Sequence, residues 1–232
     1  IRADIIRRGK GSKWELIEVK SSSELTATYI SDAAVQRYVL EGAGLSISKT
    51  YLMHINTKYV RHGNIDVEEF FTLEDITKET SELMGIVPMQ LKAMQAMLAL
   101  SAPPDIEIGP HCRVPYECEF KSHCWAHVPE YSIFNLARGR MEKKSKLWHR
   151  GIKSVVDIPA DYPLSDAQAI QVEVARSGRP HIDREGISDF IGHFEYPLYF
   201  LDFETINPAI PPYDGLRPFQ HLPFQASLHI ER

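Results

Sequence analysis

Two acidic residues and a lysine near the start of the chain have the types and spacing of a hydrolytic metal site. Glu18 and Lys20 lie two positions apart, and Asp4 lies a short distance upstream. Carboxylates are hard oxygen ligands for Mg²⁺ or Mn²⁺, and such an ion polarises a phosphodiester and activates a bound water. A neighbouring lysine can orient that water or neutralise the charge that develops on the phosphoryl group. The same residues also fit a simpler interpretation, a surface hairpin with a Glu–Lys pair.

The backbone that must position these residues is predicted to be a β-hairpin. Residues 1–8 and 14–20 have the patterns of strands, and a polar, glycine-rich turn separates them. Because side chains alternate across a strand, we expect Glu18 and Lys20 to share one face. With the turn centred on the glycine-rich segment, Asp4 lies opposite Glu18 to within about one residue of register. The hairpin therefore gathers the three side chains into one cluster.

A fourth residue joins this cluster through a family resemblance. Gln36 lies on the helix predicted after the hairpin, away from the centre of its apolar face, so its position alone indicates a solvated side chain. The resemblance rests on the order of four residues: Asp4, Glu18, Lys20 and Gln36. This order resembles the core of the RecB-like PD-(D/E)XK nucleases. The resemblance implies that the Asp and the Glu bind metal, that the Lys is catalytic and that the Gln supports the site. The chain departs from the family at Leu40, where a tyrosine is common.

All the cysteines of the chain lie in one irregular segment, as Cys112, Cys118 and Cys124. Such clustering favours a metal or cluster site over inert thiols. A zinc site would take its fourth ligand from one of three nearby histidines: His111, His123 or His127. An iron–sulfur cluster needs a fourth cysteine. The trio resembles the C-terminal cysteines of the iron–sulfur subgroup of RecB-like nucleases, which implies a structural cluster whose fourth cysteine lies upstream, although the first pair is more closely spaced in that subgroup.

The most basic stretch of the chain covers residues 138–153, where Glu142 is the one acidic residue. A solvated helix face and a phosphate-binding surface both fit this composition. Residues 147–159 resemble a helix–hairpin–helix-like turn, in which amides near a glycine hold a phosphate. The candidate nucleic-acid contacts are six basic side chains: Arg138, Arg140, Lys143, Lys144, Lys146 and Arg150.

A second acidic pair, Asp202 and Glu204, ends a strongly apolar strand predicted over residues 197–205. Both carboxylates point to one face, and a buried strand tolerates two acids only beside a metal or other partners. The pattern resembles the first motif of the DEDD exonucleases, which have an RNase-H-like fold, and this implies that both residues bind catalytic Mg²⁺ or Mn²⁺. Residues 219–230 are expected to form the next strand. The later acidic motifs of that family are absent from the chain.

Further elements are predicted from periodicity and capping signals. They are strands at 51–56 and 59–61 and helices at about 31–41, 79–100, 166–177 and within 183–194. The first of these helices is expected to bury Ala34, Val35, Tyr38 and Val39. The apolar stripe of helix 79–100 is expected to pack in the core, with a break or kink at Pro88.

The bulk composition is that of an ordinary globular protein, with 44% hydrophobic and 25% charged residues. The net charge of −5 argues against a uniformly basic nucleic-acid surface but leaves room for a local groove. Without a signal peptide or a membrane-length apolar run, a reducing, cytoplasmic location without membrane partners is expected. Both termini lie in or directly after strand patterns, so the chain is expected to be an internal piece of a longer protein.

These features predict an α/β protein in three parts. Residues 1–130 form a restriction-endonuclease-like mixed sheet with helices and end in the cysteine loop, 131–194 form a helical linker, and 195–232 begin an RNase-H-like domain. This order resembles an uncharacterised bacterial family that joins a RecB-like nuclease core to a DEDD-type exonuclease.

The resemblance implies metal-dependent hydrolysis of DNA phosphodiester bonds in repair or defence, with Mg²⁺ or Mn²⁺ and an iron–sulfur cluster, or zinc in its place, as cofactors. The alternative is a catalytically inactive nucleic-acid-binding module stabilised by zinc or an iron–sulfur site. A small-molecule ester hydrolase finds no support, since the chain has no Ser/His/Asp pattern and no phosphate-binding glycine loop.

Overall fold

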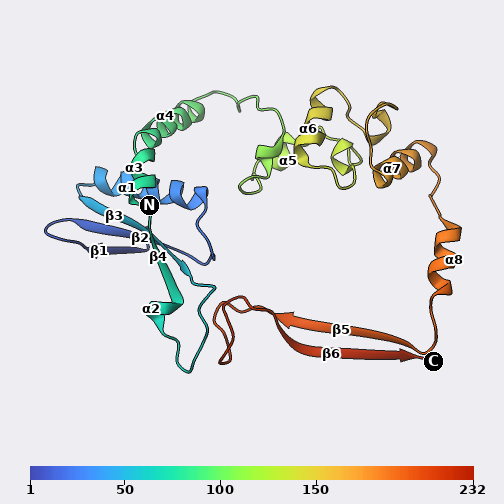
Figure 1. Ribbon diagram of the computed structural model, residues 1–232. Coiled ribbons are helices and arrows are strands. Elements are labelled where there is room, and N and C mark those ends of the chain that lie inside the picture. The colour runs from blue at the N-terminus through green and yellow to red at the C-terminus, as the bar shows by residue number, and fades with distance from the viewer. The chain divides into compact units, whose positions relative to one another are not determined.

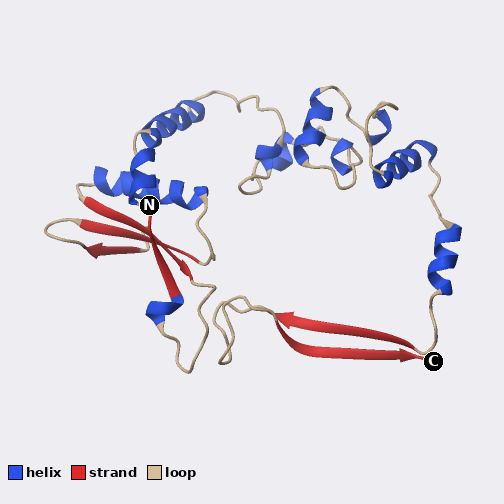
Figure 2. Cartoon of the chain, in the orientation of Figure 1, coloured by secondary structure: helices blue, strands red, loops and turns tan.

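The computed structural model describes residues 1–232, and the chain divides into two compact units. The first unit combines Ile1–Ser101 with Tyr196–Arg232, and the second consists of Ala102–Glu195. Figure 1 follows the chain by colour through both units, and Figure 2 shows that the strands all belong to the first. A mixed sheet with helices confirms the predicted α/β fold class.

The strands form two separate sheets. The larger sheet has the order β1-β2-β3-β4, with strands β1 (Ile5–Arg8), β2 (Trp14–Lys20), β3 (Ile47–Ile55) and β4 (Phe71–Asp75). β2 pairs antiparallel with β1 and parallel with β3, and β3 pairs antiparallel with β4. The smaller sheet, here called the ribbon, pairs two antiparallel strands: β5 (Leu198–Ile206) and β6 (Leu222–Glu231).

The helices are distributed over both units. Those of the first unit are α1 (Ala27–Gly42), α2 (Val67–Phe70), α3 (Thr77–Leu83) and α4 (Ile86–Leu98). Those of the second are α5 (Lys121–Cys124), α6 (Met141–His149), α7 (Asp166–Ser177) and α8 (Arg184–Gly192), with 3₁₀ turns η1 (Pro110–Cys112), η2 (Ile133–Asn135) and η3 (Val155–Asp157). None of these helices combines the length and apolarity needed to cross a bilayer.

The N-terminal hairpin has the predicted register. Ile5 pairs with Ile17, so the next position outward places Asp4 across from Glu18. The turn contains Gly11 at φ +69°, a left-handed conformation that glycine adopts without a steric penalty. β2 is therefore anchored on one side by β1 and on the other by β3.

Helix α1 begins earlier than predicted, and its buried residues include Ala34 of the predicted set. Its N-cap is Thr26, whose hydroxyl accepts a hydrogen bond from the Tyr29 amide, and Ala33, Gln36 and Leu40 are among its buried residues. These three positions share one face because they are spaced by three and four residues. The predicted burial of Val39 is wrong, since 38% of its surface is exposed.

The strand predicted at residues 59–61 is not formed; the fourth strand of the sheet is β4. The Arg61 amide instead donates to the Leu216 carbonyl at 3.0 Å, and the Arg61 guanidinium donates to the Pro211 carbonyl at 2.8 Å. Arg61 therefore holds the loop between β5 and β6 by hydrogen bonds.

The helix predicted over residues 79–100 is two helices that separate at Gly85. Pro88 does not break α4, because it lies in the first helical turn, where no backbone amide needs an intrahelical partner. The predicted core packing of its apolar stripe is wrong. Val87 is buried, but Met94 is 54% exposed and Leu98 is 76% exposed.

The second unit has its own apolar core, built from residues between 108 and 172. Cys112 is buried in it, and Cys124 and Trp125 pack against it. The cysteine segment therefore folds with the predicted linker and not with the mixed sheet. The second compact unit begins at Ala102, and the apolar partners of the cysteine segment lie later in the chain within this unit.

Candidate active site on β2 and α1

Glu18 is the centre of a hydrogen-bonded cluster in the first unit. It is only 4% exposed, and each of its carboxylate oxygens has a partner. The Lys20 ammonium donates to Oε1 at 2.6 Å, and the Gln36 side-chain amide donates to Oε2 at 2.6 Å. Asp4 directly precedes β1, and its Oδ2 accepts the amide of Val19, the residue after Glu18, at 2.9 Å. The structure thus joins Glu18, Lys20 and Gln36 through their side chains and places Asp4 on the backbone beside Glu18.

The burial of Gln36 follows from the packing of α1 on the sheet. Leu40 packs with Leu16 of β2, and Ala33 packs with Leu52 of β3, so the face of α1 between them lies against the strand that carries Glu18. Figure 1 shows α1 beside the sheet. Gln36 is 5% exposed, and the sequence periodicity that indicated a solvated side chain was misleading.

Asp32 is a member of this cluster that the sequence interpretation missed. Its Oδ2 accepts a hydrogen bond from the Lys20 ammonium at 2.6 Å. Asp32 lies four residues before Gln36 on α1, so the two side chains share a helical face. That spacing was the available signal in the sequence.

The electrostatic environment keeps Lys20 charged. Burial by itself lowers the pKa of Lys20, but its hydrogen bonds and charge interactions with Asp32 and Glu18 outweigh burial and raise the pKa above the ordinary lysine value. For Asp32, burial raises the pKa, and the hydrogen bond and charge of Lys20 more than compensate, so the pKa is lowered. Lys20 is therefore a cation at neutral pH and acts as a fixed positive charge, not as a proton acceptor.

The residues present fit a small divalent cation held by two carboxylates. Mg²⁺ in proteins is commonly bound by one or two carboxylates together with waters and substrate phosphates. Glu18 on β2 and Asp4, the residue directly before β1, supply these carboxylates. Gln36 Oε1 is buried without a protein partner, which provides a further oxygen acceptor beside Glu18. The structure holds no cluster of three or more His, Cys, Asp or Glu residues suited to a metal.

The cysteine segment is arranged differently. Cys112 is buried and Cys118 and Cys124 are partly exposed; the Cys118 amide donates to the Cys112 carbonyl at 2.9 Å. Because the three thiols form no group suited to a metal, the segment in this arrangement does not by itself fit a zinc or iron–sulfur site. The visible role of Cys112 and Cys124 is packing in the core of the second unit.

The second acidic pair lies on the ribbon, and its environment is open. Asp202 pairs with Ser227 and Glu204 with Gln225, so both acids lie on one polar face. Residues of the opposite face are apolar and include Leu201 and Leu228. The predicted strand is confirmed as β5, but Asp202 and Glu204 are exposed on it and not buried.

The six basic candidates of the second unit divide into two groups. A pocket is lined by Arg138, Arg140, Lys143 and Lys144, whereas Lys146 and Arg150 do not line it. In the segment that resembles a helix–hairpin–helix turn, α6 is followed by Gly151 at φ +86° and then by η3.

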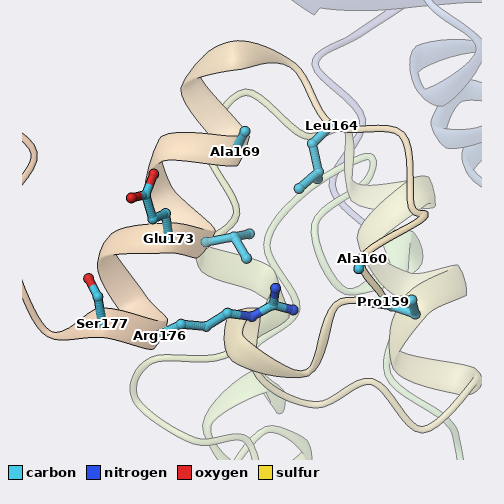
Figure 3. A pocket seen from close by; sticks show the side chains of 8 residues that line it. Pro159, Ala160, Leu164, Ala169, Glu173, Arg176 and Ser177 are labelled. Atoms are coloured by element: carbon cyan, nitrogen blue, oxygen red, sulfur yellow. The ribbon is translucent and has the colours of Figure 1, made fainter.

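A neighbouring pocket beside α7 contains one basic residue with a structural role. Figure 3 shows Arg176 extending from α7 toward the segment with Pro159 and Ala160. Its guanidinium donates to the carbonyl oxygens of Val156, at 3.1 Å, and Ile158. Arg176 therefore holds η3 against α7 and is not free to bind an anion.

Comparison with known proteins gives one partial match. A family model described as a domain of unknown function (DUF2779) matches residues 199–232, which cover most of the ribbon. No curated protein and no solved structure is significantly similar to the chain. The match assigns no activity to the ribbon, and it does not extend to the cluster around Glu18.

Proposed function

We propose that the first unit is a divalent-metal-dependent nuclease that hydrolyses phosphodiester bonds, with DNA as the expected substrate. The observation that carries the proposal is the network around Glu18, in which Lys20 and Gln36 each fix one carboxylate oxygen at 2.6 Å. A buried carboxylate held in this way, with Asp4 directly before β1 across from it, has a fixed orientation toward a ligand. The arrangement is that expected of a PD-(D/E)XK site.

In this proposal each residue has a distinct task. Asp4 and Glu18 would hold Mg²⁺ or Mn²⁺, which when bound polarises a phosphodiester and lowers the pKa of a water ligand. Lys20 supplies a permanent positive charge next to the developing negative charge. Asp32 and Glu18 hold the Lys20 ammonium from two sides, and Gln36 prevents rotation of the Glu18 carboxylate.

The direct test is cleavage by the Lys20→Met variant, which keeps an unbranched side chain one atom shorter and removes its charge. Protein purified without oxygen is incubated with Mg²⁺ or Mn²⁺ and with single-stranded DNA, duplex DNA or RNA. We expect Lys20→Met to slow cleavage by about 10²–10³-fold. The matched control is Lys49→Met, which removes an exposed lysine paired with Asp75 on the same sheet and should cleave like the wild type.

Equal cleavage by the wild type and Lys20→Met, with both folded by circular dichroism, would refute the catalytic role of Lys20. If the wild type binds nucleic acid but cleaves none of the substrates, the alternative of an inactive binding module is correct. The basic pocket of the second unit is the observation that favours this second function.

The proposal extends to two further features, the acidic pair of the ribbon and the cysteine segment. Asp202 and Glu204 share one face of the ribbon, and neither carboxylate is paired with a basic side chain. Both are therefore available to a divalent ion, and they would form part of an exonuclease site. The cysteine segment would bind an iron–sulfur cluster or zinc only after its thiols converge. Elemental analysis and visible absorption of anaerobically purified protein distinguish iron from zinc, and protein free of both refutes this extension.

A further inference from the structure

The second unit contains a pocket whose size suits a nucleotide. It lies between the segment after η2, the start of α6 and the start of α7, and its volume is about 660 Å³. Small-molecule sites in proteins commonly have volumes of about 300–1,000 Å³. All of its lining residues belong to the second unit.

The charge of this pocket has one sign. Its lining contains four basic residues and no acidic one: Arg138, Arg140, Lys143 and Lys144. The ion pairs of the second unit join Lys121 to Glu117 and His149 to Glu107, so none neutralises a basic residue of the pocket. Four cations converging on one cavity without a carboxylate favour an anionic ligand.

Lys144 is the partly buried member of this basic set. The Lys144 ammonium donates to the Phe134 carbonyl at 2.8 Å, which fixes its position. Burial, and then the positive charge of Arg113, lower the pKa of Lys144. A bound phosphate would offset both effects, because it places negative charge beside the ammonium group.

The positions of these cations also argue against a simple solvated helix face. Arg138 and Arg140 precede α6, and only Lys143 and Lys144 lie on the helix. Lys146 and Arg150, at and beyond the far end of α6, do not line the pocket. The backbone before the helix therefore turns two arginines toward the two lysines of its first turns.

One aromatic side chain completes the lining. Tyr162 is partly buried, packs against the core of the second unit and borders the pocket. Aromatic side chains beside cationic grooves provide stacking surfaces for unpaired bases. A base in a duplex has both faces covered by its neighbours, so this surface suits a single strand.

We infer that this pocket binds one nucleotide unit of a single-stranded nucleic acid, with the phosphate held by Arg138, Arg140 and Lys143 and the base beside Tyr162. The inference rests on the proposed function, since the bound strand is the substrate of the nuclease site. The inference adds a binding site in the second unit that is separate from the nuclease site. It also specifies that the bound nucleic acid is single-stranded.

The test measures binding without cleavage, by fluorescence anisotropy of a labelled oligothymidylate of about 12 nucleotides in EDTA. The double variant Arg140→Gln/Lys143→Gln removes two exposed charges of the pocket. We expect it to weaken binding at least about tenfold and to flatten the slope of log affinity against log salt by about 1.4. The matched control is Lys146→Gln/Arg150→Gln, which makes the same charge change outside the pocket and should alter affinity less than about twofold.

Two further probes test the remaining parts of the inference. An oligomer with abasic sites keeps the phosphates but offers no base, and we expect it to bind at least about fivefold more weakly. A duplex of the same length should compete less well than the single strand. Equal loss of affinity in both double variants, preference for the duplex, or no binding by the wild type would each overturn the inference.

These outcomes are separable from those of the nuclease proposal. If the wild type cleaves DNA while the pocket variant binds and cleaves normally, the inference fails and the nuclease site stands. If the pocket variant loses binding but the wild type cleaves nothing, the inference stands and the proposed nuclease function fails.

Discussion

The chain presents two carboxylate pairs on strands, and only one of them is built into a fixed geometry. Asp4, directly before β1, follows the hairpin register to a position across from Glu18 on β2, and α1 covers the strand that carries Glu18. Asp202 and Glu204 lie on the ribbon, where Oδ1 of Asp202 accepts a hydrogen bond from the neighbouring Phe203 amide. The difference shows that an acidic pattern becomes a candidate site where a helix supplies complementary donors.

Burial explains why this difference matters chemically. A carboxylate that is 4% exposed must be satisfied by its neighbours, and this requirement holds Glu18 in one orientation. An exposed carboxylate is solvated in many rotamers, so nothing on the ribbon selects one orientation of Glu204. A glutamate therefore has one fixed orientation at position 18 and many orientations at position 204.

The largest expected effect comes from the same substitution made in both regions. Glu18→Gln removes a proposed metal ligand and should reduce metal-dependent cleavage by about 10³-fold, whereas Glu204→Gln should retain the activity of the first site. Initial cleavage rates in Mg²⁺ and Mn²⁺ check this. Activity that remains in Glu18→Gln and disappears in Glu18→Gln/Asp202→Asn would show that the ribbon carries a second site.

The next effect concerns stability in the cluster. Lys20→Met leaves Glu18 and Asp32 without their shared cation and should lower the free energy of unfolding by about 2 kcal/mol. Urea denaturation measures this change. Adding Glu18→Gln to the variant should restore part of the loss, because the remaining buried group is then neutral; strictly additive effects would contradict the coupling.

A smaller effect is expected in the pH dependence of the Lys20–Asp32 bridge. The folded-state pKa of Asp32 is lowered, so its contribution is complete above its unfolded pKa of about 3.9 and is lost as the pH falls further. The pKa of Lys20 is raised, so its contribution is lost only well above about pH 10. The stability difference between the wild type and Asp32→Asn should therefore be constant from about pH 5 to 9 and shrink below about pH 4. A change centred near neutrality would be inconsistent with these directions.

The smallest effect is expected for the ribbon. Asp202→Asn and Glu204→Gln should each change the free energy of unfolding by less than about 0.5 kcal/mol, because exposed side chains without strong partners contribute little. Thermal melting with and without Mg²⁺ measures both stability and ion binding. A clear stabilisation by Mg²⁺ in the wild type that Asp202→Asn abolishes, while Glu18→Gln retains it, would move the metal site to the ribbon.

Local pattern was sufficient for several elements of the fold. The hairpin, its register and α7 follow from alternation, glycine-rich turns and capping residues, which act over a few neighbouring positions. The same reasoning failed for α4, whose apolar stripe is largely exposed. Periodicity identifies the apolar face of a helix, but it does not identify a partner for that face.

The sequence by itself determined that Glu18 and Lys20 share a face of β2, because strand alternation depends only on the backbone. It also determined that Asp4 lies opposite Glu18, because the turn sets the hairpin register. The packing of α1 on the sheet decided the rest: it buried Gln36 against Glu18 and brought Asp32 to Lys20. Tertiary structure likewise separated the four basic residues that line the pocket from the two that do not. These contacts join segments that are far apart in the sequence. Apolar packing across the whole unit places such segments beside each other, and a local sequence pattern does not reveal it.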